Sequence, residues 1–472
     1  MGESISLLYN VLAGRWRAGG DSTEGTMPAV SRWRRTVAAP LVVTMIALAL
    51  AGAAAVRAAG EAETTTSTPS AGTAVPDPLL EDVARRLDRG RFFFRYGRMG
   101  SHLFFTRQLR LHEGLAELTP RQALAAGIKV DVESLPPAVV DAIRDGAVDL
   151  DDPAVTAALL QLDAVLGVIA KFREGGLASV GITCALCHST VDDSLAPGIG
   201  RRLDGWANRD LDVGAVLSLA RDLQPLADLL GVDVPTVRTV LASWGPGKFD
   251  AHLNLDGRAF RPDGGSAAVL IPPAFGLSGV NLATYNGWGS VTYWNAFVAN
   301  HEMSGLGTFF DPRLADPVEF PVAAAAGFDD VDDPVDAITA KLADLHFYQL
   351  ALSPPTPPPG SFDAEAAERG RALFAGRAGC ADCHVPPLFT EAGWNLHAPE
   401  EIGIDAFQAE RGPTGRYRTT PLRGLWSHTR GGFYHDGRFA TLREVIDHYD
   451  GFLGLGLSET EKGDLEHYLR SL

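Results

Sequence analysis

Two short motifs contain the residues whose types and spacing are most suited to chemistry. Residues 184–188 (CALCH) and 380–384 (CADCH) share the pattern Cys-x-x-Cys-His. Two thiols three residues apart lie on one helical turn and can add across the two vinyl groups of a haem, while the adjacent histidine is held beneath the iron. The motifs therefore predict two covalently bound haem c groups, attached through Cys184, Cys187, Cys380 and Cys383 and ligated by His188 and His384.

Paired cysteines have other uses that this chain fits less well. A Cys-x-x-Cys pair can act as a redox dithiol, and two pairs can form the halves of a zinc site. The sequence contains four cysteines, and all of them lie in the two motifs. Two copies, each followed directly by histidine, favour haem attachment over either alternative.

Helices are expected around both motifs. Asp152 and Pro153 begin a helix whose apolar residues recur at helical spacing as far as Ile169, and the helix is predicted to end near residues 175–176. Residues 363–374 predict a helix before the second motif, and the capping box at 458–461 (SETE) begins a C-terminal helix. The predicted fold class is mostly α, with two cytochrome-c-like haem domains, the first of them enlarged by insertions.

The N-terminal residues 1–59 predict a signal peptide or membrane anchor. Three arginines at 32–35 precede an uncharged apolar run at 36–56, and small residues follow it. The run is also long enough to span a bilayer. We therefore expect the protein in the periplasm or on the extracytoplasmic face of the membrane, either soluble after cleavage or anchored by its N-terminus.

Two breaks in composition divide the rest of the chain. Residues 60–78 are rich in Thr, Ser and Pro and predict a flexible linker, and the proline-rich residues 354–360 cannot sustain a helix. They separate a first haem domain at 79–353 from a second cytochrome c domain at 361–472. Apart from the haem motif, no internal repeat is evident in the sequence.

The charge of the chain excludes one class of partner. The formal net charge is -17, and because phosphate binding requires a basic surface, no nucleic-acid partner is expected. An acidic surface would suit a basic redox protein, although it also promotes solubility. A redox partner protein or a membrane electron-transport chain is the predicted partner.

The residues after the second motif carry a family resemblance. Residues 418–424 (RTTPLRG), 433–437 (FYHDG) and 440–442 (ATL) resemble the corresponding segment of the bacterial di-haem cytochrome c peroxidases, a superfamily that includes the methylamine dehydrogenase-maturing enzymes. The resemblance covers about 361–472 and is thin over 79–353. It implies that the second haem relays electrons to the first, where hydrogen peroxide or oxygen reacts. A Ca²⁺ ion between the domains is typical of those peroxidases, but the sequence shows no ligand signature for it.

The same resemblance narrows the choice of distal ligand for the second haem. In the family a Met or Tyr follows the His of the FYHDG-like segment by fourteen residues, and here that position is Tyr449. Its neighbour His448 is the other candidate, since no methionine occurs after Met303. The capping pattern at 441–444 (TLRE) places both on one helix, about 100° apart, so only one of them can face the iron.

The first haem has no obvious distal ligand, because residues 189–251 contain neither His nor Met. Candidates are Met303 and His301 in the segment 291–303, with Met99, His102 and His112 as further options; a five-coordinate iron is an equal alternative. A base or hydrogen-bond donor above an open iron would come from His301, Glu302 or Asp204. Further candidates are Arg201 and Arg202 for haem propionates and Trp206 for electron relay or core packing.

Two functions remain open from the sequence. The first is electron transfer through two covalently attached haems, both of them six-coordinate. The second is a di-haem peroxidase or oxidase that reduces hydrogen peroxide, or activates oxygen, at the first haem. Whether the protein is an enzyme depends on the sixth ligand of each iron.

Overall fold

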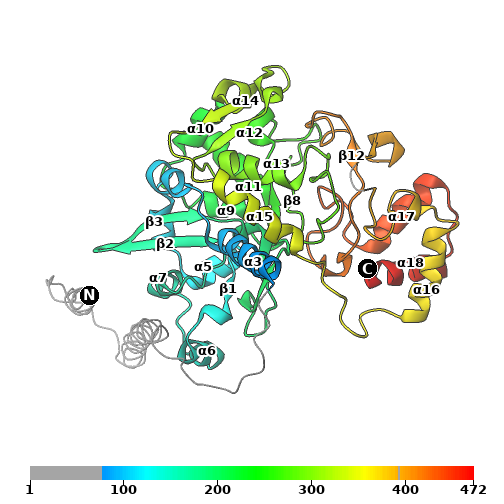
Figure 1. Ribbon diagram of the computed structural model, residues 1–472, viewed down its shortest axis with the longest axis horizontal. Coiled ribbons are helices and arrows are strands. Elements are labelled where there is room, and N and C mark those ends of the chain that lie inside the picture. The colour runs from blue at the N-terminus through cyan, green and yellow to red at the C-terminus, as the bar shows by residue number, and fades with distance from the viewer. Residues whose placement is uncertain (1–76, 392–393) are drawn as a thin grey trace, which may run out of the picture.

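The computed structural model describes residues 77–391 and 394–472. The predicted signal or anchor at 1–59 and all but the end of the predicted linker at 60–78 lie outside the described residues. The described chain is mostly helical, as predicted, and its strands form two-stranded sheets. Figure 1 shows a larger body containing residues 77–353 and a smaller helical body at the C-terminal end. No helix among the described residues is long and apolar enough to cross a membrane.

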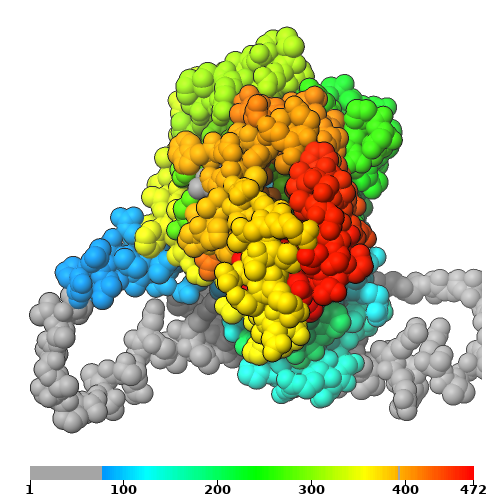
Figure 2. Space-filling view, turned by 90° about the vertical axis from the view of Figure 1, so that its right-hand side faces the viewer, coloured from blue at the N-terminus to red at the C-terminus, as the bar shows by residue number. Residues whose placement is uncertain are grey.

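The smaller body is closed by two helices, α16 (Ala364–Ala375) and α18 (Glu459–Ser471), which lie against each other (Figure 2). Asp363 caps the first, and the predicted capping box of Ser458 and Glu461 begins the second. The helices approach closely at Gly370, where a Cβ atom would lie 2.0 Å from the Asp464 carbonyl oxygen. Both predicted helices are thus confirmed.

A third helix of this body, α17 (Leu442–Leu453), carries the two distal-ligand candidates. The Thr441 side chain accepts a hydrogen bond from the Glu444 backbone N–H, as predicted. The Glu444 carboxylate, however, accepts from the Ala440 backbone N–H at 2.6 Å rather than from Thr441. The helix start is confirmed, although the reciprocal bond is made one residue earlier than a capping box requires.

The larger body is closed by a similar pair of helices, α3 (Pro78–Tyr96) and α15 (Thr339–Ala351). A Cβ atom at Gly90 would lie 2.1 Å from the Asp344 carbonyl oxygen. Arg89 pairs with the Asp344 carboxylate at 2.7 Å, and the Phe94 and Tyr348 rings meet edge to face at 5.6 Å.

The same three contacts recur between α16 and α18. Arg369 pairs with Asp464 at 2.7 Å, and the Phe374 and Tyr468 rings meet edge to face at 5.2 Å, on either side of Gly370. The segments 89–94 (RGRFFF) and 369–374 (RGRALF) share Arg-Gly-Arg and the final Phe, and 344–348 and 464–468 share Asp-Leu and Tyr. The expectation that nothing but the haem motif repeats was therefore wrong.

Between α3 and α15 the larger body contains a long insertion. The predicted helix begins at Pro153, but α7 (Pro153–Gln161) ends well before residue 175. Asp163 and Gly167 have positive φ angles of 52° and 73°, which turn the chain out of the helix. Ile169 instead lies in β2 (Val168–Arg173), which pairs with β3 (Gly176–Ile182) in an antiparallel hairpin. The prediction of one long helix was wrong.

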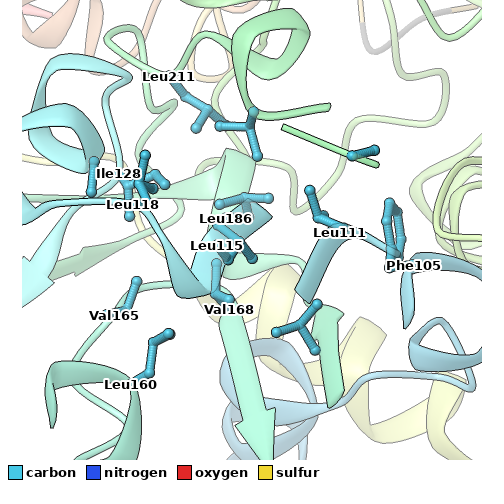
Figure 3. Close-up of a cluster of buried hydrophobic side chains, with 14 of the residues drawn as sticks. Phe105, Leu111, Leu115, Leu118, Ile128, Leu160, Val165, Val168, Leu186 and Leu211 are labelled. Carbon is cyan, nitrogen blue, oxygen red and sulfur yellow. The ribbon is translucent and has the colours of Figure 1, made fainter. Parts of the chain in front are cut away.

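A large apolar core lies behind the first haem motif. Figure 3 shows side chains of this core, which come from the N-terminal helices, the β2–β3 hairpin and the motif itself. Leu186, between the two cysteines of the first motif, is buried in it. The motif is therefore held by side chains that are far apart in the sequence.

The two bodies are joined by a buried ionic group. The Arg411 side chain of the C-terminal body is fully buried and pairs with Asp250 at 3.0 Å and Asp256 at 2.8 Å, both from the larger body. The backbone N–H of Leu270 donates to the carbonyl of His435 at 2.7 Å. Because a buried cation is stable only with its counter-charges, these contacts tie the bodies together.

Candidate haem sites

The first motif lies on a short helix, α8 (Ala185–His188). The His188 Nδ1 atom is 3.1 Å from the Pro272 carbonyl oxygen. A carbonyl can only accept, so Nδ1 carries the proton and Nε2 keeps a free lone pair for a metal. Burial lowers the pKa of His188 to about 4, which keeps the imidazole neutral and able to bind iron.

The second motif repeats this arrangement. Cys380 begins a 3-10 turn, η5 (Cys380–Asp382), and the His384 Nδ1 atom is 3.1 Å from the Phe389 carbonyl oxygen. Burial also lowers the pKa of His384. Both histidines thus present a neutral imidazole with its Nε2 atom unprotonated, which is the form that a proximal haem ligand requires.

The four cysteine thiols are free of disulfide bonds. Burial raises the pKa of Cys184 to about 11 and that of Cys187 to about 12, so neither is a reactive thiolate at neutral pH. Among the described residues, the cluster with metal-ligand spacing is Cys383, Glu391 and His397. It draws on one motif alone, which argues against a shared zinc site, and its single carboxylate does not suit Ca²⁺.

The two candidates on α17 face different surroundings. The Nε2 atom of His448 lies 3.1 Å from the Ile402 carbonyl oxygen, and its ring stacks on Phe452. Burial raises the pKa of Tyr449, and the nearby Cys383 and Cys380 raise it further. Tyr449 is therefore the candidate on the side of the haem-attachment cysteines.

The candidates from the segment 291–303 separate in space. The His301 ring is buried between Phe328 at 4.5 Å and Phe309 at 4.8 Å, away from the motif cysteines, and burial lowers its pKa to about 4. Met303 packs in a different cluster with Met99 and Ala185, against which Cys184 also lies. Of the two, Met303 is on the side of the first motif.

The remaining candidates from the sequence already have hydrogen-bond or ion-pair partners to different extents. The Asp204 carboxylate accepts from Arg95 at 2.6 Å, from the Tyr348 hydroxyl at 2.6 Å and from Ser189 at 2.8 Å. With three donors it is a structural group and is not available as a base. Arg201 pairs with Asp192 and Arg202 pairs with Asp131. The Nε and Nη1 atoms of Arg202 are nevertheless buried without a hydrogen-bond partner among the described residues, so Arg202 stays a candidate for a propionate.

Glu302 differs from Asp204 in being almost without partners. Burial, and then the Asp250 carboxylate, raise its pKa well above the usual range. Its Oε2 atom accepts from Asn254 at 3.2 Å, while its Oε1 atom is buried with no hydrogen-bond partner among the described residues. The raised pKa favours the protonated form of Glu302, and one of its oxygens is free to bind another group.

Two similar curated proteins were found. The methylamine utilization protein MauG of Methylorubrum extorquens is 39% identical over 88 residues, which are 18% of this chain and 24% of MauG. The cytochrome c peroxidase IdrP1 of Denitromonas iodatirespirans is 30% identical over 151 residues, 22% of this chain and 40% of IdrP1. The chain is a relative of the di-haem cytochrome c peroxidases.

The relationship to the di-haem cytochrome c peroxidases supports haem-based redox chemistry at the level of the superfamily. The matched segments span less than half of either relative. No protein-family profile matches the chain. Among solved structures, hydrazine synthase of Kuenenia stuttgartiensis aligns with 47% of this chain and 86% of its own, at 17% identity and a TM-score of 0.27, which is below the level at which two chains share a fold.

Two partly buried arginines near the motifs were not recognised from the sequence. Arg209 follows Asn208, whose backbone N–H donates to the Cys187 carbonyl at 2.8 Å, and Arg418 begins the segment RTTPLRG. Arg418 lies within the segment that carries the family resemblance, so the sequence could have drawn attention to it. Nothing in the sequence around Arg209 distinguishes it from a surface arginine.

Proposed function

We propose that this protein is an exported di-haem c-type cytochrome, with one haem bound covalently at each motif, that transfers electrons to or from a redox partner protein or a membrane electron-transport chain. The observation that carries the proposal is the matched pair of proximal histidines. His188 and His384 each donate Nδ1–H to a backbone carbonyl at 3.1 Å and leave Nε2 free. When bound, the haems would supply the one-electron chemistry.

An aromatic contact supports electron passage between the two sites. The Trp206 and Trp426 rings, one from each body, meet edge to face at 5.5 Å. Trp206 follows Gly205, whose backbone N–H donates to the His188 carbonyl at 2.8 Å. Trp426 lies next to Leu425, which belongs to the core of the C-terminal body. We assign this tryptophan pair as the link between the haem sites.

For the second haem we propose Tyr449 as the distal ligand. It faces the two attachment cysteines, whereas His448 is held by the Ile402 carbonyl. Tyr449→Phe should change the spectrum of one ferric haem, because it removes the ligating oxygen but keeps the ring. His448→Phe is the matched control and should leave the spectrum unchanged. The reverse result would assign the ligand to His448.

A second candidate function is reduction of hydrogen peroxide at the first haem, and Glu302 favours it. A buried carboxylic acid that stays protonated can donate a proton to the leaving oxygen of a peroxide. Asn254 fixes one carboxyl oxygen, so the other can orient toward the substrate. Glu302→Gln keeps the shape and the hydrogen-bonding capacity but removes the acid.

Spectroscopy and turnover together separate the two functions. If the protein is a peroxidase, we expect a high-spin signal from one haem and turnover of peroxide. Glu302→Gln should then lower the turnover at least about a hundredfold, in line with general acid catalysis. Pure electron transfer predicts two low-spin haems in both redox states and no reaction with peroxide. Because the first haem could open only after the second is reduced, the mixed-valence state should also be measured. Absence of haem from the purified protein would overturn both functions.

A further inference from the structure

The Arg209 and Arg418 side chains are partly buried and carry hydrogen-bonding atoms that have no partner. The Nε and Nη1 atoms of Arg209 and the Nε atom of Arg418 are buried without a hydrogen-bond partner among residues 77–391 and 394–472. Neither guanidinium makes a salt bridge to a carboxylate within that part of the chain; the Nη1 atom of Arg418 donates to the Leu282 carbonyl at 3.0 Å. Burial lowers the pKa of Arg418 to about 10 and also lowers that of Arg209.

Buried arginines of the same protein have the carboxylate partners that Arg209 and Arg418 lack. Arg411 pairs with two aspartates at 3.0 and 2.8 Å, and Arg202 pairs with Asp131 at 3.0 Å. Removing a guanidinium from water without a counter-ion is costly, and folded proteins rarely retain such a group. The lack of a carboxylate beside Arg209 and Arg418 therefore indicates that the functional protein places an anion there.

Both arginines are connected to a haem motif through the backbone. Arg209 directly follows Asn208, whose N–H is bonded to the Cys187 carbonyl. Arg418 is two residues before Thr420, whose backbone is within hydrogen-bonding reach of the His384 ring. Tyr285 connects the two arginines: its phenol interacts electrostatically with both, and its backbone carbonyl accepts from the Arg418 N–H at 2.9 Å. The two cations thus lie between the motifs.

We propose that Arg209 and Arg418 form a carboxylate-binding site between the two motifs and that its ligand is a haem propionate. This inference rests on the proposed function, because it requires a bound haem. A propionate is a carboxylate fixed to the edge of the ring, and a guanidinium binds such a group through two parallel N–H donors. The site would neutralise the propionate and set the orientation of the haem that carries it.

The proposal has a consequence that can be measured independently of turnover. A fixed positive charge near a haem disfavours the ferric state, which carries one more positive charge than the ferrous state. Replacing Arg209 or Arg418 by glutamine should therefore lower one midpoint potential. We expect the equilibrium constant for reduction to fall about tenfold, which is about 59 mV for one electron.

The test compares five variants of the full-length, haem-loaded chain: Arg209→Gln, Arg418→Gln, the two corresponding lysine variants, and Arg121→Gln. The last is the matched control, because Arg121 forms an exposed ion pair with Asp151 on the surface. Haem content and the potentials of both haems are measured by a pyridine haemochrome assay and by spectroelectrochemical titration. We expect two haems in every variant, lowered potentials in the glutamine variants, partial restoration by lysine and no change in the control.

Wild-type potentials in both glutamine variants, with two haems attached, would overturn the site. A free inorganic anion is the competing occupant; in that case the wild-type potentials would vary with chloride or phosphate concentration at constant ionic strength, which would also overturn the proposal. If the glutamine variants do not fold, an experimental structure of the haem-loaded wild type decides, since a propionate oxygen must lie within about 3.2 Å of one guanidinium. A wild-type protein without haem would instead overturn the proposed function itself.

Discussion

The two bodies share the helix pair that closes each of them and differ in what that pair encloses. The larger body extends from α3 to α15, Pro78 to Ala351, and the smaller from α16 to α18, Ala364 to Ser471. Each pair has the same Arg–Asp ion pair, the same close approach at a glycine and the same edge-to-face Phe–Tyr contact. The repeated part therefore needs few residues, and the rest of the larger body is free to vary.

The two bodies differ in the carbonyl group that accepts a hydrogen bond from the proximal histidine. In the smaller body the carbonyl that accepts from His384 belongs to Phe389, five residues later. In the larger body the carbonyl that accepts from His188 belongs to Pro272, 84 residues away. The smaller body can hold its ligand through local structure alone, whereas the larger one depends on the insertion. The insertion also supplies the free acid, Glu302.

The largest difference between the bodies should follow from removing each pair of cysteines in turn. Cys184→Ala/Cys187→Ala and Cys380→Ala/Cys383→Ala should each lose one of two haems, as counted by intact mass. The smaller body has a small apolar core, so the second variant should also lose the helical circular dichroism of α16 and α18. The larger core should keep the first variant folded. Two haems in either variant would contradict the assignment of the motifs.

Substitution of Arg411 should weaken the coupling between the two bodies. Arg411→Gln leaves Asp250 and Asp256 buried without their cation, and this should lower the free energy of unfolding by about 3–5 kcal/mol. Because Arg411 bridges the bodies, urea unfolding should then show two transitions. Arg121→Gln, at an exposed pair, should change stability by no more than about 1 kcal/mol. A single transition with wild-type midpoint would show that the bodies are coupled elsewhere.

The larger body should respond to acid in part through His301, a buried histidine, as the smaller body should through the buried His435. The folded pKa of His301, about 4, lies below the unfolded value of about 6.5. The unfolded chain therefore binds the proton first, and stability is lost as pH falls from about 6.5 to about 4, by about 3 kcal/mol in total. His301→Phe should remove this part of the loss when urea unfolding at pH 7 and pH 4.5 is compared. An unchanged difference would show that His301 does not titrate with unfolding.

The smallest effects should test whether the two helix pairs are equivalent. Gly90→Ala and Gly370→Ala each place a Cβ about 2 Å from a backbone oxygen of the partner helix, so each should destabilise its body by about 1–3 kcal/mol. Gly451→Ala is the control, because a Cβ there meets nothing within 4 Å inside α17. It should stabilise the protein by about 0.5–1 kcal/mol. The losses of stability are measured by thermal unfolding. Unequal losses for Gly90→Ala and Gly370→Ala would show that the two helix pairs are not energetically equivalent.

The sequence predicted local features well and distant ones poorly. The starts of α7, α16, α17 and α18 follow from capping side chains within a few residues, and all four were predicted. The end of α7 was missed, because the positive φ angle of Asp163 is not a common property of aspartate. The repeated helix pair was missed because its shared residues are few and lie 280 positions apart in the first helices and 120 positions apart in the second.

The candidate site shows the same limit. The motif residues were assigned from spacing, but the choice between His448 and Tyr449 depends on how α17 is rotated against the rest of the body. The roles of Asp204 and Glu302 depend on hydrogen-bond partners that come from other elements, such as Arg95 and Asn254. Sequence spacing contains neither kind of information.

The position of the motif thiols also affects how the protein is assembled. Cys184 and Cys187 are only partly exposed in the closed larger body, and the helix of the first motif, α8, lies against α3. We therefore expect attachment to be faster before closure, which requires α15. Since α15 begins at Thr339, far beyond His188 in the chain, a polypeptide crossing a membrane N-terminus first would leave the first motif accessible for a long interval. The second motif is followed much sooner by α18 and has a shorter one, so slow haem supply should first yield molecules that carry only the first haem.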